Sequence, residues 1–235
     1  MTAILLNQTN FDQAWAAETL YELIRPGMKV CILPLAYEEG WASDAEIFQD
    51  RFSEGSEYYE DLRRPFLAYG IKPQDIYFAD YHREEPEELE HDIRRSDILC
   101  VVGNDPEECM MRMEDLGLIR TIRNYPGLLI TISEASKILL EEYYRTPDED
   151  HDFEYRDGLG LLSGFDLDTH YFEDVFHLGG IIRALEEKGR SIAILPDKGG
   201  ILLDHGNVEL LGNAFIAGPD DLDEIYQLYH EVEER

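Results

Sequence analysis

The chain has 235 residues, of which 44% are hydrophobic, and its 20 basic and 51 acidic residues give a formal net charge of −31. Such a charge repels phosphate backbones and anionic lipids, so nucleic acids and membranes are not expected as partners. No Pro/Gly/Ser-rich stretch separates two halves, which predicts one domain over residues 1–235.

The cysteines indicate a reducing compartment. Cys31 and Cys100 lie inside apolar strand-like runs, and with Cys109 as the third they cannot form a disulfide framework. Met1–Gln8 lacks the basic region and the cleavage site of a signal peptide, and it is typical of a first buried strand. We therefore expect a cytoplasmic protein.

Short apolar runs with strand character recur along the chain. Several of them, such as Leu-Leu-Ile-Thr-Ile, are almost continuously apolar, which is typical of strands that are buried on both faces of a parallel sheet. The predicted strands are Ala3–Leu6, Lys29–Leu35, Asp75–Ala79, Asp97–Val102, Leu128–Ile132, Ser191–Leu195, Gly200–Asp204 and Val208–Leu210.

Longer amphipathic runs between the strands predict helices. Asp105 before Pro106 is typical of an N-cap, and Gly189 after Lys188 is typical of a C-cap. The predicted helices are Phe11–Ile24, Ser43–Gly70 (as one or two helices), Pro86–Arg95, Asp105–Leu116, Ala135–Tyr143, Val175–Lys188 and Asp220–Val232.

The alternation of strands and helices predicts an α/β fold with a mostly parallel open sheet and helices on both faces. Gly200–Asp204 and Val208–Leu210 flank His205-Gly206-Asn207, and this pattern predicts a C-terminal antiparallel β-hairpin. Arg145–Gly158 has no periodicity and is expected to be an exposed loop.

Candidate functional residues follow the predicted strands, where the ligand sites of open α/β sheets collect. Gly103-Asn104 could hold an oxyanion or carboxylate, or could be an ordinary strand-to-helix turn. Ser133 could be the nucleophile of a sharp strand-to-helix elbow, or a helix N-cap. His170 could be a general base with Asp197 as its acidic partner, or the two could be a packed histidine and a turn residue.

Four segments between Asp97 and Gly218 stand in a recognisable order: VVGNDPEECMMRMEDLGL, LLITISEASKILLEEYY, GLGLLSGFDLDTHYF and IAILPDKGGILLDHGNVELLGNAFIAG. Together they resemble the aspartyl dipeptidase (peptidase E) and cyanophycinase family of serine peptidases. The third segment, with its Gly-Leu-Gly-Leu start and its Asp-x-His-Tyr end, is the most specific of the four. The resemblance implies a class I glutamine amidotransferase-like fold for the whole chain.

The resemblance also implies the chemistry. Ser133 would be the nucleophile, His170 the general base and Asp197 the residue that orients the histidine. Gly103 and the amide of Glu134 would form the oxyanion hole, and Asn104 would lie beside them in the substrate site. The implied substrates are small acidic (aspartyl) peptides or isopeptides. A frame shifted by one residue would instead match Glu134 to the nucleophile.

The elbow departs from the family pattern, because Thr131 and Ala135 replace its two glycines and Glu134 adds a carboxylate next to the nucleophile. Strain at these positions and repulsion of the oxyanion are therefore expected. These departures leave a second hypothesis open, a catalytically inactive relative that binds a ligand or partner through the same cleft. No metal-ligand spacing or dinucleotide fingerprint occurs, so we expect neither a metal nor another cofactor. The expected oligomeric state is a monomer or a homodimer.

Overall fold

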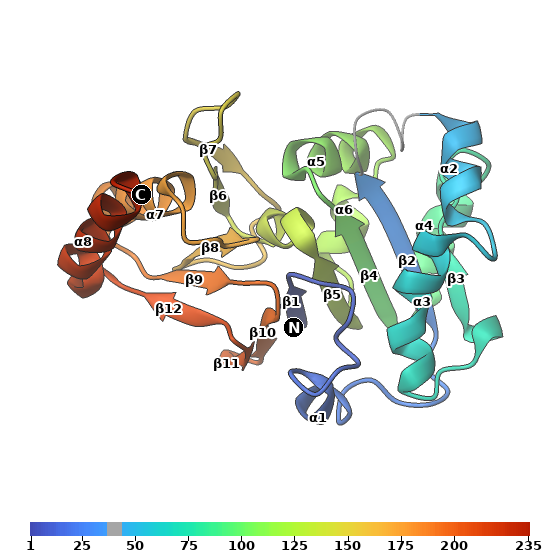
Figure 1. Ribbon diagram of the computed structural model, residues 1–235. Helices are drawn as coiled ribbons and strands as arrows, with labels where there is room; N and C mark the ends of the chain where they lie inside the picture. Colours follow the sequence, from blue (N-terminus) through green and yellow to red (C-terminus); the bar gives the residue numbers. More distant parts are fainter. Residues whose placement is uncertain (37–43) are drawn as a thin grey trace.

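The computed structural model describes residues 1–36 and 44–235, and its centre is a seven-stranded sheet of order β11-β10-β1-β5-β4-β2-β3 (Figure 1). Five of these strands run parallel, and β10 and β11 form an antiparallel hairpin beside β1. The fold is thus the predicted α/β fold with a mostly parallel sheet and a C-terminal hairpin. The strands are β1 (Thr2–Leu6), β2 (Val30–Ala36), β3 (Ile76–Phe78), β4 (Ile98–Gly103), β5 (Leu128–Ile132), β10 (Gly199–Asp204) and β11 (Asn207–Gly212).

Helices cover both faces of this sheet because its strands are apolar on both sides. On one face Leu5 shares a core with Cys109 and Ile122, and on the other Ile4 shares a core with Phe48 and Phe66. The helices of the first face are α4 (Pro86–Arg95), α5 (Pro106–Asp115) and α6 (Ile119–Arg123), and those of the second face are α1 (Ala17–Leu20), α2 (Ala45–Phe52) and α3 (Glu57–Ala68).

A second, smaller layer lies beside the β10–β11 side of the main sheet, at the left in Figure 1. Its three-stranded sheet has the order β12-β9-β8, and its own core joins Ile192 and Ile194 to Ile181, Leu185 and Tyr144. The elements of this layer are β6 (Glu142–Arg145), β7 (Glu154–Asp157), β8 (Asp166–Thr169), α7 (Val175–Lys188), β9 (Ile192–Leu195), β12 (Phe215–Ala217) and α8 (Leu222–Glu233).

Three predictions of local structure were wrong. The predicted helix Ala135–Tyr143 is a 3₁₀ helix, η2 (Ser133–Leu139), followed by β6; every residue from 135 to 140 is buried, so the segment lacks the polar face of an amphipathic helix. The predicted loop Arg145–Gly158 contains β7 and completes a β6–β7 hairpin. Of the predicted helix Phe11–Ile24 only α1 is helical. The residues before it form turns, in which Phe11 is buried in the core and Nε1 of Trp15 donates to the carbonyl of Asn10.

The remaining predicted helices and strands agree closely with those of the structure. α4, α7 and β5 have the predicted bounds, and the predicted region Ser43–Gly70 contains two helices, although Ser43 itself lies outside the described residues. The sequence did not predict β8, β12 or α6. Within residues 1–36 and 44–235, no helix combines the length and apolarity needed to cross a bilayer.

Candidate active site

Ser133 occupies a sharp turn at the end of the buried strand β5. It is the first residue of η2, and its backbone has φ 66°, a left-handed conformation that residues with a side chain rarely adopt. A φ of this kind costs on the order of 1–3 kcal/mol and is kept where its surroundings enforce it. The turn lifts the hydroxyl above the sheet edge, as a nucleophile elbow does.

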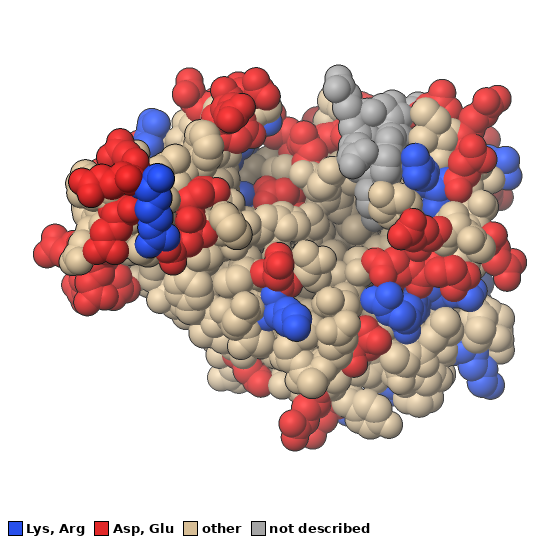
Figure 2. Space-filling model, viewed as in Figure 1, with Lys and Arg blue, Asp and Glu red and all other residues tan. Residues whose placement is uncertain are grey.

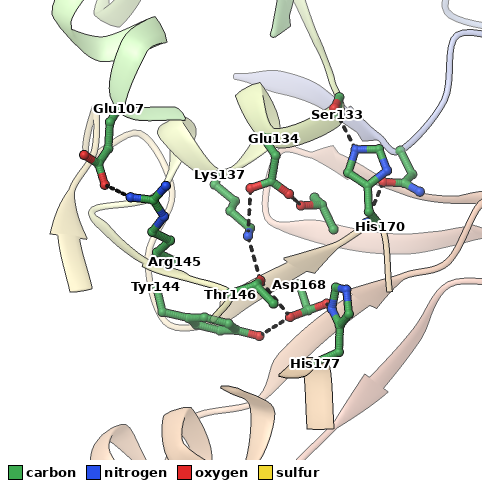
Figure 3. Close-up of polar contacts among 12 residues, drawn as sticks. Glu107, Ser133, Glu134, Lys137, Tyr144, Arg145, Thr146, Asp168, His170 and His177 are labelled. Atoms are coloured by element: carbon green, nitrogen blue, oxygen red, sulfur yellow. Dashed lines mark hydrogen bonds and ion pairs between the residues drawn. The ribbon is translucent and has the colours of Figure 1, made fainter. Parts of the chain in front are cut away.

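His170 follows β8 and reaches the same point from the smaller layer. Its Nε2 lies 2.7 Å from Oγ of Ser133, within hydrogen-bonding distance (Figure 3). Its backbone is also left-handed, with φ 54°, and its amide donates a hydrogen bond of 2.8 Å to Oδ1 of Asn7. Asn7 is buried at the end of β1, so the histidine is anchored to the main sheet. The structure thus brings together the serine and the histidine that the sequence singled out.

His170 is exposed at the cavity, but its surroundings favour the neutral form of its ring. Desolvation by the surrounding protein is the largest influence and lowers the pKa of His170 below its usual value of 6.5. Weaker contributions come from Glu134 and Asp197, whose charges raise this pKa, and from Lys137 and His177, whose charges lower it. A neutral imidazole 2.7 Å from a hydroxyl can accept its proton.

Asp197 lies in the exposed turn between β9 and β10. Its charge reaches His170, but within residues 1–36 and 44–235 no hydrogen bond joins Asp197 to the histidine ring. The acid of the Asp-x-His segment, Asp168, accepts instead from Nδ1 of His177 at 2.7 Å. The described geometry is therefore a serine–histidine pair with a more distant acidic side chain.

The oxyanion-hole residues predicted from sequence flank the serine. Gly103 ends β4, where a Cβ would collide with Sγ of Cys109 and would lie 3.2 Å from the backbone nitrogen of Ala36. The amide of Glu134 lies in the first turn of η2, where amides have no acceptor within the helix. The amide of Asn104 donates to the carbonyl of Ala36 at 3.1 Å, so it is not free to bind an oxyanion.

The elbow needs no glycine at positions 131 and 135. Among the described non-glycine residues, a positive φ occurs only at Ser133, His170 and His205. The expected strain at Thr131 and Ala135 is therefore wrong, because a single left-handed residue makes the whole turn. The side chain of Thr131 makes a hydrogen bond that a glycine could not make, because its Oγ1 donates to Oγ of Ser136 at 3.1 Å.

The carboxylate of Glu134 is held by two partners. Its Oε2 pairs with Nζ of Lys137 at 2.9 Å, and its Oε1 accepts a hydrogen bond from Oγ1 of Thr169 (Figure 3). Lys137 is fully buried and also donates to Oγ1 of Thr146 at 3.1 Å. The expected repulsion of an oxyanion is thus countered by an adjacent positive charge.

Lys137 belongs to a polar network that the sequence analysis missed. Thr146 donates to the buried Asp168 at 3.3 Å, and Asp168 also accepts from the hydroxyl of Tyr144 at 2.7 Å and from His177. Only one local signal was available, because Glu134 and Lys137 are three residues apart, the spacing that aligns side chains on a 3₁₀ helix. The other members come from β6, from Thr146 directly after it, and from β8 and α7, and only the fold brings them together.

A cavity of 280 Å³ opens beside His170 and Glu134, and Figure 2 shows the surface hollowed between α5 and the smaller layer. Its wall carries the acidic residues Asp105, Glu107 and Asp148 and the basic Arg145, whose guanidinium is 3.5 Å from Glu107. In the part of the chain that the structure describes, no group of three or more His, Cys, Asp or Glu side chains could hold a metal ion.

Solved structures of peptidases share this fold. A candidate peptidase E protein from Listeria monocytogenes EGD-e superimposes with a TM-score of 0.63 at 16% identity, covering 89% of this chain and 96% of that one. A peptidase from an acI-B1 Actinobacterium gives a TM-score of 0.63 at 13% identity, covering 93% of this chain and 91% of that one. No family model and no curated protein matches the sequence. The likeness is therefore one of fold, across almost the whole length of each chain.

Proposed function

We propose that this chain, which has a divergent peptidase E-like fold, is a serine-type hydrolase that cleaves small peptides with Ser133 as its nucleophile and His170 as its general base. The observation that carries the proposal is the 2.7 Å distance from Oγ of Ser133 to Nε2 of His170 at a left-handed turn beyond β5. A hydroxyl alone is a weak nucleophile, and a neutral histidine at this distance is what activates it.

The reaction would proceed in two steps. Oγ of Ser133 attacks the substrate carbonyl while its proton passes to Nε2 of His170, and the histidine then gives this proton to the leaving amine. The negative charge on the carbonyl oxygen would face the amide of Glu134 beside Gly103, and fixed amides stabilise such charge most in the transition state. A water molecule would then give a proton to the same histidine and attack the acyl carbon; as the acyl–Oγ bond breaks, the histidine would return the proton to Oγ of Ser133.

Small acidic peptides or isopeptides are the substrates that we propose. A cavity of 280 Å³ has room for little more than a dipeptide. On its wall the half-buried Arg145 keeps N–H groups available for a substrate carboxylate, while Asp105 and Asp148 could receive a substrate ammonium group. Replacement of Arg145 by glutamine should therefore raise KM for an aspartyl dipeptide more than for its asparaginyl counterpart.

The cytoplasm is the compartment that we propose for this activity. Cys31, Cys100 and Cys109 are all buried and free, which suits a reducing environment. The hypothesis of an inactive relative rested on the lost glycines and on Glu134. Neither is an obstacle to catalysis here, because the turn needs only one left-handed residue and the carboxylate is paired with Lys137.

A fluorophosphonate probe tests the nucleophile directly. Ser133 of the wild-type chain should be phosphonylated, as detected by mass spectrometry of its peptide, and Ser133→Ala and His170→Ala should both lose the label. Two matched controls should keep it: Ser163→Ala, which removes an exposed hydroxyl, and His205→Ala, which removes an exposed histidine whose φ of 48° is also left-handed. Absence of label from a folded wild-type chain, or equal labelling of Ser133→Ala, would contradict the proposal.

A further inference from the structure

The residue next to the nucleophile is an acid, and a buried lysine accompanies it. Glu134 contributes its backbone amide to the proposed oxyanion site, while its side chain carries a negative charge only a few bonds away. Unless this carboxylate is held back, it opposes the charge that develops on the substrate oxygen.

The side chain of Lys137 has no exposed surface, and its ammonium group has partners on two sides. It lies 2.9 Å from Oε2 of Glu134 and 3.1 Å from Oγ1 of Thr146, and it lies 5.6 Å from the centre of the Tyr144 ring. A buried ammonium group is costly unless it is paired, so this lysine and Glu134 hold each other in place. Thr169 fixes the other carboxylate oxygen, and Figure 3 shows the paired side chain turned away from Ser133.

We propose that Lys137 is a positioning residue of the active site: it holds the Glu134 carboxylate away from the nucleophile and cancels its charge, so that the Glu134 amide can stabilise the oxyanion. This inference rests on the proposed function. It assigns a role to Glu134, which stands where the Ser-Ala-Gly-Ala pattern has its first alanine, and to Lys137, three residues further along.

The two charges also act on His170 in opposite directions, which gives a readout that a purely structural role would not change. Glu134 raises the pKa of the histidine and Lys137 lowers it, beside the contributions of desolvation, His177 and Asp197. Loss of Lys137 should therefore raise the pKa that governs catalysis, loss of the Glu134 charge should lower it, and loss of both should restore it.

The experiment follows the rate of phosphonylation of Ser133 against pH. In this reaction Oγ of Ser133 bonds to phosphorus, the P–F bond breaks, fluoride leaves and the hydroxyl proton passes to His170. Lys137→Met should slow labelling by about tenfold or more and move the acid limb of the profile up by about one pH unit. Glu134→Gln should move the limb down, and the double variant Glu134→Gln/Lys137→Met should return both rate and limb towards the wild-type values.

The matched control is the pair Lys188–Glu142, which is joined at 2.7 Å and does not line the cavity. Lys188→Met should leave rate and profile unchanged. Circular dichroism verifies the fold of each variant, and if Lys137→Met does not fold, the downward shift in Glu134→Gln and its reversal in the double variant still decide the question. Equal limbs in all folded variants, or a double variant slower than both single ones, would overturn the role of Lys137. An unlabelled wild-type chain would instead overturn the proposed function itself.

Discussion

Ser133 and His170 share a backbone conformation that is uncommon for residues with side chains, with φ of 66° and 54°. Each is held there by a neighbouring element, Ser133 by the junction of β5 with η2 and His170 by its hydrogen bond to Asn7. Strain of this kind is kept where it orients reactive groups. Here it directs the two side chains towards each other, so the stability lost at these residues serves the geometry of the pair.

Glycine at position 133 should relieve this strain. Ser133→Gly is expected to raise the free energy of unfolding by about 1 kcal/mol or less, because glycine accepts a positive φ but is more flexible in the unfolded chain. The same variant should lose all phosphonylation. Chemical denaturation measures the stability, and Ser163→Gly, at an exposed residue without a positive φ, should give no gain. A clear loss of stability in Ser133→Gly would contradict the assignment of strain to this residue.

The pH dependence of labelling should follow from the lowered pKa of His170. Desolvation lowers the pKa of His170 below 6.5, so the base becomes protonated and inactive only at a pH under that value. The acid limb of the labelling rate should therefore lie below pH 6.5.

Asp197→Asn should change the rate of labelling much less than loss of a triad acid does. In serine proteases whose aspartate binds the histidine, that loss costs about 10⁴-fold. The charge of Asp197 raises the pKa of His170 without a hydrogen bond, so its removal should shift the acid limb further down and cost less than about tenfold in rate. Asp220→Asn, at an exposed residue far along the chain, is the control. A fall of several orders of magnitude would show that Asp197 contacts the ring during the reaction.

At the level of elements, the smaller layer brings histidine and substrate wall to the serine. β8 ends at Thr169, directly before His170. It is held by its buried acids, of which Asp166 pairs with Arg190 at 2.6 Å and Asp168 accepts from His177 at 2.7 Å. Buried carboxylates require such partners. The strand that carries the base is therefore fixed by charge pairing as well as by its backbone ladder.

The pair His177–Asp168 should make stability depend on pH. Burial by itself lowers the pKa of His177, but the hydrogen bond and the charge of Asp168 outweigh it, so the net effect is a raised pKa. A raised pKa in the folded state means stabilisation that is complete below the unfolded value of 6.5 and is lost as pH rises through the folded value.

His177→Gln should therefore lower the melting temperature more at pH 6 than at pH 9. Differential scanning calorimetry at both pH values measures the effect. His230→Gln, at an exposed histidine of α8, should show little change at either pH. Equal losses in His177→Gln at the two pH values would indicate that the imidazole is neutral in the folded chain.

At the scale of the whole molecule, the chain carries a net charge of −31, and the proposed charged substrate has to approach the cavity through the field of these charges. Figure 2 shows patches of acidic side chains on both sides of the hollow, and fewer basic side chains. Charges of this kind act on approaching molecules over a Debye length, which falls from about 30 Å in 0.01 M salt to about 8 Å in 0.15 M salt.

Salt should thus change the rate of association in a way that depends on substrate charge. Between about 0.01 M and 0.15 M NaCl, kcat/KM should rise for a peptide with net negative charge and fall for one with net positive charge. An uncharged blocked peptide is the control and should change little. If salt had the same effect on all three peptides, the overall field would not govern their approach.

The parts of the fold that could be predicted from sequence are those that local patterns determine. β5 is a continuous apolar run, α4 begins at a proline, and α7 lies between the N-cap Asp174 and the C-cap Gly189. Their bounds could therefore be predicted without knowledge of their neighbours. β8 was missed because its sequence Asp-Leu-Asp-Thr is polar, and it is buried only because distant residues pair with its acids. η2 was predicted as an α-helix because its burial on all sides depends on the packing of both layers.

The candidate site was likewise only partly predictable from the sequence. Ser133 and His170 stand in segments that resemble a known family, and the structure brings their side chains together. Lys137 could not be assigned to the site from the sequence, because its contact with Thr146 links η2 to the end of β6 through the tertiary fold. No local pattern encodes such a contact.

The burial of all three cysteines has a practical consequence. Burial raises the pKa of Cys31, Cys100 and Cys109, which keeps their thiols protonated and poorly reactive towards alkylating reagents. The native chain should therefore react little with thiol reagents. A cysteine introduced on the rim of the cavity, for example by Asp148→Cys, would take up a fluorophore selectively, and its emission could report the arrival of a peptide in real time.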